Sequence, residues 1–94
     1  MINVNEYFNG KVKSLALSVA GESVTAGVMQ AGEYEFNTGK REIMTVTAGS
    51  MDVKLPGSAE FKTYARGQSY EVPASSKFQL KIHGDCAYIC EFKD

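Results

Sequence analysis

The sequence predicts an all-β fold, a sandwich or a barrel of short antiparallel strands. Short runs in which polar and apolar residues alternate recur every 8–12 residues along the 94-residue chain, the spacing of such folds. No stretch repeats its apolar residues with the 3.6-residue period of a helix. Nine glycines lie between the runs and only two prolines interrupt them, which favours strands joined by tight turns.

The pattern predicts about nine strands, each ended by residues that favour turns. In chain order we expect Lys11–Val19, Ser23–Gln30, Glu33–Phe36, Glu42–Ala48, Met51–Leu55, Phe61–Tyr64, Ser69–Val72, Lys77–Ile82 and Ala87–Phe92. In the second of these strands Val24, Ala26 and Val28 fall on one face, because side chains alternate along a strand.

The central stretch Glu42–Pro56 is predicted to be a β-hairpin. Its two alternating runs flank a turn at Ala48-Gly49-Ser50, and Pro56 ends the second run because proline cannot donate a ladder hydrogen bond. The hairpin would carry one carboxylate, Glu42, at its mouth.

Composition limits the classes of protein that the chain can belong to. Its length suits one domain, residues 1–94, with a modest core. Ten basic and eleven acidic residues give a net charge of −1, which argues against nucleic acid as a partner. No apolar run reaches the roughly 18 residues of a membrane span, and the first residues lack the pattern of a signal peptide.

The two cysteines, Cys86 and Cys90, are expected to be free thiols. Four residues apart in one strand, they would lie about 13 Å apart, which is too far for a disulfide. Free thiols and the missing export signal favour the cytosol.

Two stretches resemble the motifs of the cupin family, which folds as a small double-sheet jelly roll. Six residues separate Glu42 from Gly49, the spacing of the first cupin motif, and Gly67–Ala74 (GQSYEVPA) resembles the second. Metal-binding cupins carry histidines near Phe36 and Asn37 and at the position of Phe78, and none is present here. A lone carboxylate is a poor transition-metal site, so the resemblance implies a cupin without a metal.

Five runs resemble a second, narrower group, the bacterial pyrimidine/purine nucleoside phosphorylase family. They are Asn5–Ser14 (NEYFNGKVKS), Gly27–Phe36 (GVMQAGEYEF), Glu42–Gly49 (EIMTVTAG), Val53–Pro56 (VKLP) and Tyr88–Cys90 (YIC). The resemblance implies a small cytosolic cupin, dimeric and without a cofactor, that splits nucleosides of either base class with inorganic phosphate into free base and ribose 1-phosphate.

Glu42 is the candidate catalytic residue. Cleaving a glycosidic bond creates positive charge on the sugar, which glycosidases stabilise with carboxylates. Glu42 could do this or bind the ribose hydroxyls; the alternative is a solvated glutamate at the start of a strand.

A base also needs an apolar platform, and aromatic faces accept any base. Tyr34, Phe36, Phe78 and Tyr88 are the candidates, with core packing as the alternative for each. Met44, on the strand face of Glu42, and Gln68 of the second motif complete the expected substrate-binding set.

Phosphate favours arginine, lysine or backbone N–H groups. Lys11 and Lys13 share one strand face, Arg41 adjoins Glu42, and Arg66 lies at the turn of the second motif. The sequence does not choose among these four, and solvated surface is the alternative for each.

His83 is the only histidine. A two-residue turn at Gly84-Asp85 would place it opposite Cys86, although an exposed turn histidine is the preferred interpretation. Two further hypotheses stay open for the whole chain: a non-catalytic cupin that binds a small ligand as a sensor or carrier, and a structural dimer with an unused pocket.

Overall fold

The computed structural model describes residues 1–94 and confirms an all-β architecture, with ten strands where about nine were predicted. The strands are β1 (Val4–Tyr7), β2 (Val12–Val19), β3 (Glu22–Met29), β4 (Gly32–Asn37), β5 (Arg41–Ala48), β6 (Ser50–Lys54), β7 (Lys62–Ala65), β8 (Ser69–Val72), β9 (Lys77–Ile82) and β10 (Cys86–Lys93). The one helical element is a 3₁₀ turn, η1 (Phe8–Gly10), and no helix has the length and apolar character needed to cross a membrane.

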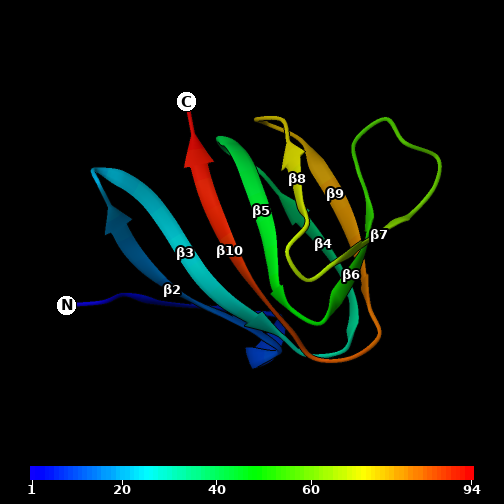
Figure 1. Ribbon diagram of the computed structural model, residues 1–94, viewed down its shortest axis with the longest axis horizontal. Helices are drawn as coiled ribbons and strands as arrows, with labels where there is room; N and C mark the ends of the chain where they lie inside the picture. The colour runs from blue at the N-terminus through cyan, green and yellow to red at the C-terminus, as the bar shows by residue number, and fades with distance from the viewer.

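The strands form two antiparallel sheets. The six-stranded sheet has the order β1-β2-β3-β10-β5-β8, and the four-stranded sheet has the order β4-β9-β6-β7. In Figure 1 β2, β3, β10 and β5 run side by side on the left, while β9 and β6 lie on the right. Strands distant in sequence are therefore neighbours: β10 lies between β3 and β5.

A core of 15 buried residues fills the space between the sheets. Met44 and Val46 of β5 face Met51 and Val53 of β6, and none of the four is more than 3% exposed. The predicted alternation is confirmed here, because sheets packed face to face bury every second residue of a strand.

The hairpin predicted over Glu42–Pro56 is wrong. β5 pairs with β10 and β8 in the larger sheet, whereas β6 pairs with β7 and β9 in the smaller one. Gly49 has a φ of +76°, and a Cβ there would lie 3.0 Å from the carbonyl oxygen of Asp85. The chain thus crosses between sheets at a corner. A corner and a hairpin turn both need such a glycine, so the local sequence does not separate them.

The predicted placement of His83 opposite Cys86 is also wrong. β9 and β10 belong to different sheets, so Gly84 and Asp85 link the sheets and close no hairpin. The imidazole is exposed, as predicted, with 73% of its side chain accessible, and its Nε2 lies 2.7 Å from Oδ2 of Asp52.

The strand missing from the prediction is β1. Its four residues pair with β2 at the edge of the larger sheet, from Val4 opposite Leu15 to Tyr7 opposite Val12. Three of the four are exposed, so no alternation of buried and exposed residues marks the strand in the sequence.

The outer side of the larger sheet is partly apolar. The face of β3 that holds Val24, Ala26 and Val28 lies on the outer side of the sheet, where Val24 is covered (7% exposed) and Val28 is 56% exposed. Val4, Leu15, Leu17 and Val28, all large apolar residues more than 40% exposed, form what we term the outer apolar face.

Candidate active site

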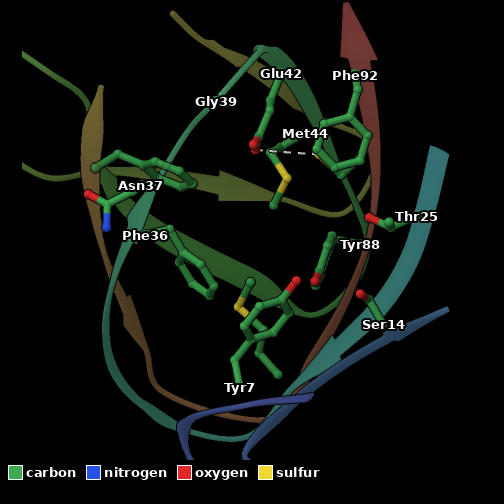
Figure 2. Close-up of a pocket in the computed structure, with 13 residues that line it drawn as sticks. Tyr7, Ser14, Thr25, Phe36, Asn37, Gly39, Glu42, Met44, Tyr88 and Phe92 are labelled. Atoms are coloured by element: carbon green, nitrogen blue, oxygen red, sulfur yellow. Dashed lines mark hydrogen bonds between the residues drawn. The ribbon is translucent and has the colours of Figure 1, made fainter. Parts of the chain in front are cut away.

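A cavity of about 260 Å³ lies between the two sheets (Figure 2). The larger sheet supplies most of its lining and the smaller one supplies three residues from β4 and β9. The lining residues are Tyr7, Ser14, Thr25, Met29, Phe36, Asn37, Gly39, Glu42, Met44, Phe78, Tyr88, Cys90 and Phe92.

Glu42 stands at the start of β5 with its carboxylate directed into this cavity (Figure 2). It shares the inward face with Met44 and is half-buried. The Cys90 thiol donates a hydrogen bond to its Oε1 at 3.5 Å. Burial raises the pKa of Glu42, and the hydrogen bond from Cys90 offsets part of that rise. The interpretation of Glu42 as a solvated surface residue is therefore wrong.

Hydroxyl groups of the larger sheet continue this polar side of the cavity. Ser14 is buried, accepts a hydrogen bond from Nδ2 of Asn5 at 3.2 Å, and lies in one row with Tyr88, because Gly27 is the cross-strand partner of both. Thr25 is the cross-strand partner of Cys90. Burial raises the pKa of Tyr88 to about 12, so its phenol stays protonated at physiological pH. We call Ser14, Thr25, Glu42, Tyr88 and Cys90 the polar wall.

A glycine makes room for the ring of Tyr88. Gly27 lies beside Tyr88 across the β3–β10 ladder, and a Cβ at Gly27 would overlap the ring. Glycine inside a strand costs backbone entropy, and here it allows the close approach that places Tyr88 in the polar wall.

Aromatic rings form the opposite side, which we call the aromatic wall: Phe36 of β4 and Phe78 of β9. Their ring centroids lie 5.8 Å apart with 25° between the planes. Tyr7 meets Phe36 edge to face at 6.2 Å. Phe36 is half-buried, whereas Phe78 is only 2% exposed, so Phe36 has the more accessible ring.

Four of the six predicted substrate-binding residues line the cavity, namely Phe36, Met44, Phe78 and Tyr88, and two do not. Tyr34 is buried beside the cavity, packs on Phe8 at 4.9 Å, and donates its hydroxyl to the carbonyl of Gln30. Gln68 stabilises the β7–β8 turn, where its Oε1 accepts a hydrogen bond from the Ala65 amide at 2.7 Å.

None of the four predicted phosphate-binding residues lines the cavity. Lys11 and Lys13 border a separate hollow, and Arg66 is exposed in the β7–β8 turn. Arg41 pairs with Glu71 at 3.2 Å. It borders a third hollow with Lys40 and Lys93, and that hollow shares Phe92 with the cavity.

Eight lining residues were not predicted from the sequence: Tyr7, Ser14, Thr25, Met29, Asn37, Gly39, Cys90 and Phe92. Cys90 and Phe92 could have been predicted, because they lie two and four residues after Tyr88 on the same strand and so share its face. Ser14 gave a weaker signal, as the hydroxyl that follows Val12 on the buried face of β2. Tyr7 gave none, because its strand was not predicted.

No group of three or more His, Cys, Asp and Glu side chains is placed to hold a metal ion. Phe36, Asn37 and Phe78, which occupy the positions of histidines in metal-binding cupins, all line the cavity. With Glu42 and no histidine among them, the residues at these positions do not fit the metal centre of a cupin.

The two antiparallel sheets and the cavity between them have the arrangement of the cupin jelly roll. Consistent with this class, the chain superposes on an RmlC-like cupin from Shewanella frigidimarina with a TM-score of 0.77 at 19% identity, over 98% of this chain and 83% of that one. A protein of unknown function from Vibrio parahaemolyticus is more similar, with a TM-score of 0.96 and 43% identity over 99% of both chains.

The narrower relationship comes from the sequence. Residues 2–92 match the family model described as pyrimidine/purine nucleoside phosphorylase. A protein of that name from Pseudomonas aeruginosa is 56% identical over 93 residues, 99% of this chain and 100% of that protein. One from Tolumonas auensis is 52% identical with the same coverage. The chain belongs to the pyrimidine/purine nucleoside phosphorylase family.

Proposed function

We propose that the chain is a nucleoside phosphorylase of broad specificity that acts in the cavity between the two sheets. An oxygen of inorganic phosphate forms a bond to C1′ of the ribose as the bond from C1′ to the base nitrogen breaks. The proton that hydrogen phosphate loses ends on the base nitrogen, so the products are the free base and ribose 1-phosphate. The observation that carries the proposal is the Glu42 carboxylate, which faces two aromatic rings in a cavity of a chain from this family.

Each wall has its own part in the proposed reaction. The aromatic wall holds the base by stacking, which is worth about 1–3 kcal/mol per base. The polar wall contacts the ribose, and Glu42 stabilises the positive charge that develops on the sugar as the bond to the base breaks. Half-burial strengthens this stabilisation, because water screens the carboxylate less than at the surface.

Broad specificity follows from the chemistry of the aromatic wall. Phe36 and Phe78 present no hydrogen-bonding group to a base, and Asn37 is the one polar side chain that the smaller sheet contributes. A site selects strongly between bases when buried polar groups must pair with one of them. A wall of two phenyl rings accepts purines and pyrimidines alike.

For phosphate we propose the hollow bordered by Arg41. Phe92, which this hollow shares with the cavity, is the cross-strand partner of Glu42. Lys93 and Arg41 are also direct cross-strand partners, and like charges in that arrangement repel each other. An anion bound between them would relieve the repulsion, which Glu22 and Glu71 now offset by ion pairs.

We further propose that the reaction uses no metal or other cofactor, that the protein works in the cytosol, and that it is a homodimer. The outer apolar face is the proposed contact. A two-fold axis brings the same surface of two copies together, and contact would remove exposed Leu15, Leu17 and Val28 from water. Val28→Lys should convert the dimer to a monomer in light scattering; a monomeric native protein would contradict the proposal.

One assay tests the proposed reaction. Purified protein is incubated with inosine or uridine, with and without phosphate, and release of the base is followed. We expect release from both nucleosides only when phosphate is present, together with ribose 1-phosphate. Release that does not depend on phosphate would indicate a hydrolase. No release, but thermal stabilisation by nucleosides, would favour a non-catalytic binding protein.

A further inference from the structure

Cys90 makes the one side-chain hydrogen bond of the Glu42 carboxylate. In the β5–β10 ladder Cys90 is opposite Met44 and Phe92 is opposite Glu42, so Cys90 and Glu42 are diagonal neighbours on the inward face. The thiol donates to Oε1 of Glu42 at 3.5 Å, and Thr25 of β3 is the direct cross-strand partner of Cys90. Cys90 therefore lies between Thr25 and Glu42 in the polar wall, and its hydrogen bond joins β10 to β5.

The carboxylate has no stronger partner in this chain. Glu42 takes part in none of the five ion pairs, and the Cys90 thiol is its one side-chain hydrogen-bond donor. No lysine or arginine lines the cavity. A weak S–H donor thus makes the contact that charged groups make in most carboxylate sites.

Tyr7, Tyr88 and Cys90 are the other titratable groups that line the cavity, and the cations Arg41 and Lys93 adjoin Glu42 and Phe92 in the β5–β10 ladder. Burial raises the pKa of the Tyr88 phenol of β10 and of the Tyr70 phenol of β8, and the negative charge of Glu42 adds to both rises. Both phenols are therefore protonated at neutral pH. Burial also raises the pKa of the Cys90 thiol, which keeps its proton for the hydrogen bond. From β4 and β9, Phe36, Asn37 and Phe78 face the cavity, and none of them titrates.

We propose that Cys90 is a positioning residue that holds the Glu42 carboxylate toward the substrate and favours its ionised form. This role rests on the proposed function, in which the ionised carboxylate stabilises the sugar. The hydrogen bond stabilises the charged form of Glu42 against the desolvation that burial causes. Loss of the thiol leaves the carboxylate without a donor, which favours its protonated form.

The test compares Cys90→Ala and Cys90→Ser with Cys86→Ser. Cys86 lies on the same strand and is also buried, but it does not line the cavity, so it is the matched control. Cys90→Val, closer to cysteine in volume, takes the place of Cys90→Ala if that variant does not fold. The measurement is the pH dependence of kcat/KM for base release from inosine with phosphate.

For Cys90→Ala we expect the acid limb of the profile to move to higher pH and kcat/KM near neutral pH to fall about 3- to 10-fold, the worth of one hydrogen bond. Cys90→Ser keeps a hydrogen-bond donor, so the acid limb and kcat/KM should both lie closer to the native values. Cys86→Ser should change neither the acid limb nor kcat/KM. An unchanged acid limb in folded Cys90→Ala, or an equal shift in Cys90→Ser, would overturn the proposal.

A second measurement separates this inference from the proposed function. The Glu42 side-chain carboxyl is titrated by ¹³C NMR in the native protein and in Cys90→Ala. A higher pKa in the variant supports the positioning role even if the native protein releases no base, an outcome that would refute only the phosphorylase proposal. An unchanged pKa would refute the positioning role whatever the activity.

Discussion

The two walls of the cavity come from different sheets and differ in chemistry. The larger sheet contributes hydroxyls, a thiol and the Glu42 carboxylate, whereas the smaller sheet contributes Phe36, Phe78 and one amide. The larger sheet can bear polar groups in its interior because neighbouring strands supply their partners, as Asn5 of β1 does for Ser14 of β2. In the function that we propose, the larger sheet carries out the reaction and the smaller one binds the base.

The largest expected effect is that of Glu42→Gln, which keeps the shape of the polar wall and removes its charge. We expect kcat to fall about 100- to 1,000-fold, the range for loss of one stabilising group at a developing charge. Steady-state kinetics with inosine and phosphate measures this. Full activity in a folded Glu42→Gln variant would remove Glu42 from the mechanism.

Glu42→Gln should also stabilise the fold at neutral pH. Because burial raises the pKa of Glu42, the native state binds the proton more tightly than the unfolded chain, and ionisation weakens the fold. The variant should therefore melt at a higher temperature than the native protein at pH 7. The difference should vanish below the unfolded-state pKa of about 4.3, which calorimetry at several pH values can follow.

Phe36→Leu tests the aromatic wall. Leucine keeps apolar volume but removes the stacking face, so KM for nucleosides should rise about 5- to 100-fold, as the worth of one stacked base implies. KM for phosphate should stay as it is. Phe61→Leu, at an exposed ring outside the cavity, is the control; equal effects of the two changes would contradict a base platform at Phe36.

Gly27→Ala tests the space that the Tyr88 ring of the polar wall needs. The added methyl group overlaps the Tyr88 ring, so the ring or the strand must shift, at a cost of about 1–3 kcal/mol in the free energy of unfolding. Urea denaturation measures this cost. Gly39→Ala, where an added Cβ meets nothing within 4 Å, should change stability far less, and a similar loss there would indicate a backbone effect.

The smallest expected effects are those of replacing the basic residues proposed to bind phosphate. Arg41→Ala should raise KM for phosphate about 3- to 10-fold, because the Arg41 guanidinium is partly exposed and ion pairs at such sites are weak, and KM for nucleosides should not change. Lys13→Ala, which affects the separate hollow, is the matched control. An effect of Lys13→Ala alone would move the phosphate site to that hollow.

Part of this site was predictable from single strands. Phe36, Met44, Phe78 and Tyr88 were expected in it, and Glu42 was expected from its spacing to Gly49; all five line the cavity. Tyr34 shares the inward face with Phe36 but lies one row too far along β4 to reach the cavity. Alternation shows which way a side chain points, but it does not show how far along the barrel the cavity extends.

The sequence by itself determined the all-β class, most strand positions, which residues share a strand face and the absence of a cupin's metal-binding histidines. These depend on alternation and spacing, which are local properties of the chain. The tertiary structure alone decided that Gly49 is a corner between sheets, that Ser14 lies beside Tyr88, and that Cys90 donates to Glu42. Strand pairing joins residues far apart in the chain, so those contacts follow from the order of strands in the sheets.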